Sequence, residues 1–396
     1  MQITRRSWLA ASCAAASVWA HGPESRGAEP NANPASRIPL IHASDLIHPP
    51  WDVDDQIDLA CAYALSGLDM RAVIIDFHQK PDDKDPYEPA FHLITQLNWL
   101  TGRWVPAAVG PSTKLRTPTD DGLQLPLREQ TGIRLLLDQL EKAETPVYIS
   151  VTGSSRTVTA AFNRKPDLFQ KKVRAILLVA GCVYRDKSDT LDTNCRFDAN
   201  AFVGLMRSGL PIHWFPPGPV RPTSKPSKEQ YAEAIRHHAK FITPYGKLLK
   251  DLPPLLHSWF VLGFSGNQRG DLIRPLYEKW TGCTWWGLIA KAESGCSSPP
   301  ALLMAAGRRL VRTEKGWRFL AANLVPPRAE EFGWGLTPVN VTIDDQAHTV
   351  WEKAEQSNIQ LYTHPPVDGI QADSVYSTAM TEALNALFRE ELLPEQ

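Results

Sequence analysis

Short apolar segments alternate with amphipathic stretches and polar loops along most of the chain. Residues 38–42 and 70–77 are apolar, which predicts two buried strands, and residues 57–65 between them have the spacing of a helix. A strand, a helix and a strand in this order form a βαβ unit with parallel strands. The pattern therefore predicts an α/β fold at the start of the folded region.

The same alternation continues through the middle of the chain. The expected elements are a strand at residues 145–151, a helix at 156–163, a strand at 173–181, a helix at about 199–208 and a strand at 210–215. Polar clusters follow the first two of these strands. Since ligands bind at the carboxyl ends of strands in such sheets, these clusters are candidates for a site.

The C-terminal part adds further elements to the same unit. Late strands are expected between residues 317 and 343, and residues 374–392 predict a final helix. The apolar stripe of that helix consists of Met380, Ala383, Leu384, Leu387 and Phe388. We find no internal repeat and expect one domain over residues 38–392, with an open, mostly parallel sheet flanked by helices and C-terminal additions.

Five aspartates crowd the segment between the first predicted strand and the first predicted helix. They are Asp45, Asp52, Asp54, Asp55 and Asp58, all within fourteen residues. Carboxylates this close repel one another unless a cation lies among them, and a hard divalent ion with oxygen ligands is the usual one. The alternative is an Asp-rich turn that caps a helix, but one aspartate suffices for a cap. The cluster therefore predicts a metal site in a strand-to-helix loop.

Composition and charge narrow the class of protein. The 396 residues include 43% apolar ones and carry a formal net charge of −1. This length and apolar content suffice for a large core. A balanced charge without a dense basic cluster gives no general attraction to nucleic acid or to anionic membranes. We expect a small-molecule substrate, no nucleic-acid partner and no membrane association of the mature chain.

The first residues have the pattern of an export signal. Arg5 and Arg6 precede a short apolar run of small residues, and residues 18–20 form a small-x-small cleavage motif. The run is too short to span a bilayer stably, so a membrane anchor is the weaker alternative. We interpret residues 1–20 as a twin-arginine-type signal peptide and residues 21–37 as a disordered leader, and expect a periplasmic or extracellular protein.

Export would place five cysteines where disulfides form. They are Cys61, Cys182, Cys195, Cys283 and Cys296. None of them forms a C-x-x-C pair, and Cys61 and Cys182 lie in apolar segments, so most are expected to be buried thiols. A disulfide between Cys283 and Cys296 is compatible with the sequence, which does not establish it.

Three segments together resemble the nucleoside hydrolase family, the inosine/uridine-preferring nucleoside N-ribohydrolases and their relatives. Asp54-Asp55 before a helix is similar to the end of the family's Asp-x-Asp-x-Gly-x-Asp-Asp motif, and Thr152-Gly153 matches its middle strand end. The segment from Asp192 to Asp198, followed by Ser-Gly-Leu-Pro-Ile at residues 208–212, is similar to its ribose-binding region. The resemblance is clear over about residues 38–220 and fainter to about 390.

The resemblance implies a Ca²⁺ ion at the strand ends and cleavage of the N-glycosidic bond of ribonucleosides. By position, Asp45 would be a metal ligand and the catalytic base, Asp55 a metal ligand, and Thr152 a ligand through its carbonyl. Asp54 would accept a ribose hydroxyl and act in catalysis, and Asn194 would bind the ribose. Asp198, in the same ribose-binding segment, is also expected to bind substrate. A carboxylate-rich pocket suits the positive charge of an oxocarbenium-like transition state.

Two departures from the family pattern concern the cation. Eight residues separate Asp45 from Asp54, in a form that looks like a divergent bacterial branch, so Asp52 could share the metal and His48 the substrate. His48 could also be a catalytic acid, and a histidine that is hydrogen-bonded to a carboxylate in this loop is an equally good interpretation. The family's late metal-ligating His-Asp appears here as Cys296-Ser297-Ser298. Ser297, Ser298 or Glu293 could replace it, and the spacing does not choose between them.

Other polar and aromatic residues have simpler interpretations. His237 and His238 are adjacent, so on a helix they point to different faces and a solvated pair is favoured over a shared metal. Trp214 is more easily a core residue than a platform for a nucleobase.

The sequence thus predicts a metal-dependent hydrolase acting on the N-glycosidic bond of a ribonucleoside or a related pentosyl compound. Two alternatives remain: an inactive or divergent homologue that binds a sugar or nucleoside, motivated by the lost late aspartate, and a hydrolase of another extracellular glycoside. Base preference and oligomeric state are not determined by the sequence, and a homo-oligomer is compatible with it.

Overall fold

The computed structural model describes residues 37–46, 53–76, 88–183, 191–218, 227–265, 271–278, 284–367 and 370–393. The predicted signal peptide and all but the last residue of the leader therefore lie outside the described residues, as do His48, Asp52 and Cys283. No helix in these ranges is both long enough and apolar enough to span a bilayer.

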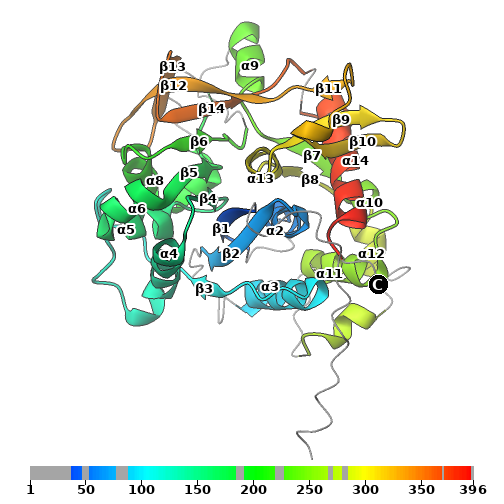
Figure 1. The fold of residues 1–396 in the computed structure, drawn as a ribbon, viewed down its shortest axis with the longest axis horizontal. Helices are drawn as coiled ribbons and strands as arrows, with labels where there is room; N and C mark the ends of the chain where they lie inside the picture. Colours follow the sequence, from blue (N-terminus) through cyan, green and yellow to red (C-terminus); the bar gives the residue numbers. More distant parts are fainter. Residues whose placement is uncertain are drawn as a thin grey trace, which may run out of the picture.

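A nine-stranded sheet forms the centre of the molecule (Figure 1). In spatial order its strands are β13 (Thr349–Lys353), β12 (Gly335–Ile343), β14 (Ile359–Thr363), β6 (Ile212–Trp214), β5 (Val173–Leu178), β4 (Val147–Val151), β1 (Ile38–Ser44), β2 (Leu68–Ile75) and β3 (Ala107–Val109). The pairs from β14 to β3 are all parallel, and β12 and β13 join antiparallel at one edge. The predicted open, mostly parallel sheet is confirmed.

Helices cover both faces of this sheet, as the parallel connections require. In Figure 1 one group lies to the left of the sheet: α4 (Thr131–Lys142), α5 (Arg156–Arg164), α6 (Pro166–Lys172) and α8 (Ala199–Met206). The opposite face is covered by α2 (Asp54–Ala64), α3 (Glu88–Thr101), α11 (Pro254–Ser265), α13 (Pro299–Ala305) and α14 (Val375–Glu390). Each face has its own core of buried apolar side chains, one including Leu40 and the other Ile41 of the same strand.

Smaller elements complete the domain. Two antiparallel sheets consist of β10 (Gly316–Ala321), β9 (Arg308–Thr313) and β11 (Glu331–Phe332), and of β7 (Phe241–Pro244) and β8 (Glu293–Cys296). The short helices are α7 (Thr193–Phe197), α9 (Lys228–Ile235), α10 (Tyr245–Leu248) and α12 (Thr284–Ile289), with 3-10 turns η2 (Leu127–Gln130), η3 (Arg274–Tyr277) and η4 (Ala322–Leu324). The expected late strands and final helix are present, and the whole stripe predicted for α14 is buried.

Several predictions about single residues can be compared with this fold. Cys61, Cys182, Cys195 and Cys296 are buried as expected. Trp214 is a core residue whose indole donates to the carbonyl of Ala180 at 2.6 Å. The prediction of a solvated histidine pair is wrong, because His237 and His238 are both buried.

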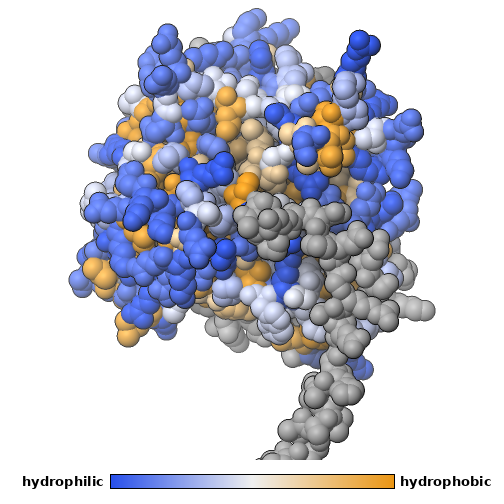
Figure 2. All heavy atoms as spheres, viewed as in Figure 1, coloured by the Kyte–Doolittle hydropathy of each residue, from blue (hydrophilic) through white to orange (hydrophobic). Residues whose placement is uncertain are grey.

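The face shown in Figure 2 is mostly hydrophilic, with apolar side chains scattered singly or in small groups between polar ones. Exposed apolar side chains scattered in this way are normal on the surface of a folded domain.

Candidate functional site

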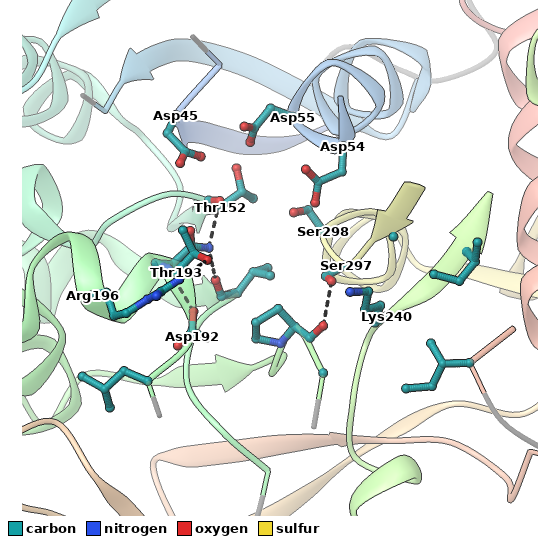
Figure 3. A pocket seen from close by; sticks show the side chains of 18 of the residues that line it. Asp45, Asp54, Asp55, Thr152, Asp192, Thr193, Arg196, Lys240, Ser297 and Ser298 are labelled. Atoms are coloured by element: carbon teal, nitrogen blue, oxygen red, sulfur yellow. Dashed lines mark hydrogen bonds between the residues drawn. The ribbon is translucent and has the colours of Figure 1, made fainter. Parts of the chain in front are cut away.

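A pocket of about 670 Å³ lies at the carboxyl ends of β1 and β4. Among the residues singled out from the sequence, Asp45, Asp54, Asp55, Thr152 and Asn194 line it. Figure 3 shows the first four of them. The five residues come from three segments that are far apart in the sequence: the end of β1 with the first turn of α2, the end of β4, and α7. The fold brings them together because β5, β4 and β1 are neighbours in the sheet and run parallel.

The two central strand ends are joined by backbone hydrogen bonds just below the pocket. The amide of Thr152 donates to the carbonyl of Ala43 at 2.8 Å, which places Thr152 beside Asp45. Gly153 follows, and a Cβ atom there would lie 3.0 Å from the Cβ, Oδ1 and backbone nitrogen of Asp45. The glycine is therefore needed for the close approach of the two loops, and it fixes how near Asp45 comes to Thr152.

Asp54 and Asp55 lie in the first turn of α2, which begins at Asp54. The prediction that they belong to the loop before the helix is wrong. The partial positive charge of a helix N-terminus favours carboxylates at these positions, which reduces their mutual repulsion. Asp55 is nearly fully buried, and its Oδ1 accepts a hydrogen bond from Ser44 Oγ at 2.9 Å. Strand β1 thus orients one of the two acids directly.

Asn194 connects two of the strand ends. Its amide nitrogen donates to the carbonyl of Thr152 at 3.1 Å and to that of Val179 at 2.8 Å. These two bonds fix the amide group and leave its oxygen as the atom able to accept a hydrogen bond from a ligand.

Asp192 is a pocket residue to which the sequence assigned no role. It caps α7 by accepting from the amide of Asn194 at 3.0 Å, and it also accepts from the amide of Gly181 at 2.7 Å. Burial raises the pKa of this carboxyl, and its hydrogen bonds oppose that shift. An aspartate directly before a short polar helix was the available signal for a cap.

Asp198 was expected to bind substrate, but it is not among the described residues that line the pocket. Its Oδ2 accepts from Arg156 Nε at 3.0 Å and from the amide of Leu115 at 2.7 Å. Its Oδ1 caps α8 through the amide of Ala201 at 3.0 Å. These bonds occupy both oxygens, so the structure gives Asp198 a role in holding loops together behind the site.

The remaining predicted residues fall into two groups. His48 and Asp52 lie outside the described residues. Of the proposed replacements for the late aspartate, Ser297 and Ser298 line the pocket, whereas Glu293 is exposed and does not. Ser297 Oγ donates to the carbonyl of Pro217 at 3.0 Å.

Asp58, the last of the five crowded aspartates, lies below the pocket wall. It is fully buried on α2, close to the hydroxyl groups of Thr152 and Ser298. Burial raises the pKa of its carboxyl well above the usual range, the two hydroxyls oppose this shift, and the negative charge of Asp45 adds to it. The crowding of acids was visible in the sequence, but the position of Asp58 relative to Ser298 was not.

Two basic residues also line the pocket, and neither was predicted. They are Arg196 of α7 and Lys240, which precedes β7. A Cβ atom on Gly295 would lie 2.1 Å from Lys240 Cε, so this glycine leaves the space that the lysine side chain occupies. The pocket therefore has an acidic wall, and Figure 3 shows the two basic residues on opposite sides of it.

The acidic wall offers donors that suit a hard cation. Asp45, Asp54, Asp55, Thr152 and Ser298 present only oxygen atoms, the ligands that Ca²⁺ takes in proteins. Among the described residues, no group of three or more His, Cys, Asp or Glu side chains is arranged so that these side chains alone could hold a metal ion. Carbonyl and hydroxyl oxygens would therefore have to complete a cation site here.

Comparisons with known proteins agree with this architecture. No protein-family model matches the sequence, and no curated protein sequence does. Solved structures do match: a purine-preferring ribonucleoside hydrolase from Gardnerella vaginalis has 14% sequence identity and a TM-score of 0.53, with 89% of this chain and 99% of that chain covered.

Two further structures show the same likeness. A plant nucleoside hydrolase has 14% identity and a TM-score of 0.52, covering 90% of this chain and 99% of its own. The type III effector protein XopQ, solved in complex with adenosine diphosphate ribose, has 14% identity and a TM-score of 0.50, covering 91% of this chain and 95% of its own. With most of the chain aligned in each case, this protein has the fold of the nucleoside hydrolases.

Proposed function

We propose that this protein is a divalent-cation-dependent hydrolase that cleaves the N-glycosidic bond of a ribonucleoside or a related pentosyl compound. The observation that carries the proposal is the convergence of Asp45, Asp54, Asp55, Thr152 and Asn194 on one pocket at the carboxyl edge of a parallel sheet. The nucleoside hydrolase fold supports it independently.

Hydrolysis of an N-glycosidic bond would explain why the wall of the pocket is acidic. In the hydrolysis a water oxygen adds to C1′ of the sugar, and the bond from C1′ to the base nitrogen breaks. The base leaves with the electron pair and takes up a proton. The sugar becomes positively charged as this bond lengthens, so carboxylates around it lower the barrier.

Each residue has a specific part in this scheme. Asp45 takes the proton of the attacking water, and Asp54 accepts a hydrogen bond from a ribose hydroxyl. The side-chain oxygen of Asn194 accepts from the sugar, because its nitrogen is held by two carbonyls. A bound Ca²⁺ would polarise the water and anchor the sugar hydroxyls.

Asp45, Asp55 and the carbonyl of Thr152 would hold the cation. Asp55 is already oriented by Ser44, and Asp45 is placed by the close contact with Gly153. Asp52 is a further candidate ligand that lies outside the described residues. All of these residues supply oxygen ligands. Oxygen ligands favour calcium, whereas zinc prefers nitrogen or sulfur ligands.

The test is release of reducing sugar from a panel of purine and pyrimidine ribonucleosides by the purified mature chain. We expect sugar release when Ca²⁺ is present, no sugar release when EDTA removes the Ca²⁺, and sugar release again when Ca²⁺ is restored. Asp54→Ala should lower kcat/KM by about 10²- to 10³-fold, as for removal of other groups that stabilise transition-state charge. Glu293→Gln, on an exposed residue outside the pocket, is the matched control.

A second candidate is binding of a nucleoside or sugar without turnover. It is favoured by Ser298, which stands at the start of α13 where the related family places a carboxylate. This candidate predicts no sugar release over the whole panel together with saturable binding of one of its members. Release of free base by the wild-type chain would exclude it.

A further inference from the structure

Among the described aspartates of the acidic segment, Asp58 is the one that faces the interior beneath the pocket. It lies four residues after Asp54 and three after Asp55 on α2, so all three are near one side of that helix. Its side chain has no exposed surface. The helix packs against α13, whose first turn follows Ser298.

The surroundings of Asp58 leave it short of partners. Within the described ranges, neither of its carboxyl oxygens accepts a well-formed hydrogen bond. Its polar neighbours are the hydroxyls of Thr152 and Ser298, and both of those residues line the pocket. A buried carboxylate is costly without compensation, so a role connected with the pocket is the simplest reason for its presence.

The two hydroxyls are free to turn towards Asp58. Ser298 is at the N-cap position of α13 but makes no side-chain cap bond there. The hydroxyl of Thr152 reaches the carbonyl of Ala43 only at 3.4 Å, which is long for such a bond. A hydroxyl that donates its hydrogen to a carboxylate behind it presents its lone pairs on the opposite side.

We propose that Asp58 is a positioning residue that turns the hydroxyl oxygen of Ser298 into a ligand for a hard divalent cation in the pocket, with the Thr152 hydroxyl held in the same way. The inference rests on the proposed function, since it assumes a cation on the acidic wall. It explains how this wall can hold a cation although the described acidic side chains form no closed cage. Asp58 would then bind to a ligand of the cation and not to the cation itself, and carboxylates in such positions commonly tune metal sites.

The test is cation binding by the full mature chain, measured by isothermal titration with Ca²⁺ and by terbium luminescence, without substrate. Asp58→Asn should weaken Ca²⁺ binding by at least about 10-fold, the usual effect of losing such an outer carboxylate. Ser298→Ala should weaken it similarly, and the double variant should be little worse than either single one, because both remove the same arrangement.

Two further measurements separate this role from a structural one. Asp58→Asn should leave the melting temperature in EDTA unchanged or raised, because it removes a buried carboxylate with no well-formed hydrogen bond. Placing a carboxylate directly at the ligand position, with Ser298→Asp in the Asp58→Asn background, should restore much of the lost Ca²⁺ affinity. Asp76→Asn, which changes another fully buried aspartate at a strand end, is the control and should bind Ca²⁺ like the wild type.

The outcomes distinguish this inference from the proposed function. A wild-type chain that binds no Ca²⁺ would contradict the cation-dependent function and this inference with it. Ca²⁺ binding by the wild type that is unchanged in Asp58→Asn would overturn only the role of Asp58. If Asp58→Asn does not fold, Ser298→Ala decides: unchanged affinity in that variant overturns the proposal, and a loss supports it.

Discussion

Arg156 and Asp198 form an ion pair of 3.0 Å in which both side chains are only 1% exposed. The guanidinium also donates to the carbonyls of Pro111 and Phe197, at 2.7 and 3.0 Å. The pair therefore joins the start of α5, the end of α7 and the segment around Pro111 behind the pocket, and its hydrogen bonds compensate the cost of burying two charges.

Breaking this pair should destabilise the fold without a direct effect on the ligand. Asp198→Ala leaves a buried guanidinium without its carboxylate, and we expect the free energy of unfolding to fall by about 3–5 kcal/mol in urea denaturation. The exposed pair of Arg207 and Asp345, at 2.8 Å, is the control, and Asp345→Ala should change stability by less than about 1 kcal/mol. A stable Asp198→Ala protein with a raised KM would instead restore the expectation that Asp198 binds substrate.

Gly153→Ala should damage the site more than the fold. The added Cβ would meet Asp45 at 3.0 Å, so Asp45 or the loop must shift by a few tenths of an ångström. Because catalytic groups tolerate little displacement, we expect kcat to fall by about 10²-fold while the melting temperature changes only slightly. Gly333→Ala is the control, since a Cβ there meets nothing within 4 Å. Full activity of Gly153→Ala would show that Asp45 does not need this placement.

Asp76 should make the stability of the protein depend on pH. It follows β2 and is fully buried, and burial raises its pKa from 3.8 to about 6, with Arg156 opposing the shift. The folded state thus holds the proton more tightly than the unfolded state. The stabilisation is complete below about pH 4 and is lost as the pH rises through about 6.

A shift of this size corresponds to at most about 3 kcal/mol. Asp76→Asn should flatten the dependence of the unfolding free energy on pH between 4 and 6, as measured by urea denaturation at a series of pH values. An unchanged pH profile in that variant would mean that other groups titrate in this range.

The export signal predicted from the sequence leads to a separate test on the first residues. We expect a cell-fractionation experiment to find a shortened mature protein in the periplasm or medium, and Arg5→Lys with Arg6→Lys to leave the full-length chain in the cytoplasm. A wild-type chain found at full length in the cytoplasm would contradict the assignment of residues 1–20.

Much of the fold was accessible from the apolar pattern, because buried parallel strands are nearly continuous runs of apolar residues. The strands ending before Asp45 and Thr152 were predicted with their order, and so was their meeting at one sheet edge. The start of α2 was misplaced by three residues. Val53 gives no side-chain cap to mark the boundary, and the acids of the first turn resembled a polar loop.

The parts of the site that escaped prediction depend on packing between distant segments. Lys240 reaches the pocket only because Gly295 of another strand leaves it room, and no local pattern carries that information. His238 is buried beside His364, whose ring lies 5.3 Å away, although adjacent histidines more often face solvent. Asp58 could be recognised as unusual only once Ser298 was seen next to it.

The double hydrogen bond of Asn194 has a consequence for how a cation and a sugar would affect each other's binding. Its amide nitrogen is attached to the carbonyl of Thr152, so the residue assigned to the sugar and the residue assigned to the cation share one contact. A cation coordinated by that carbonyl oxygen would change how firmly Asn194 is held. By thermodynamic reciprocity, the factor by which a bound cation changes the affinity for the sugar equals the factor by which a bound sugar changes the affinity for the cation. Binding of the two ligands would therefore be coupled.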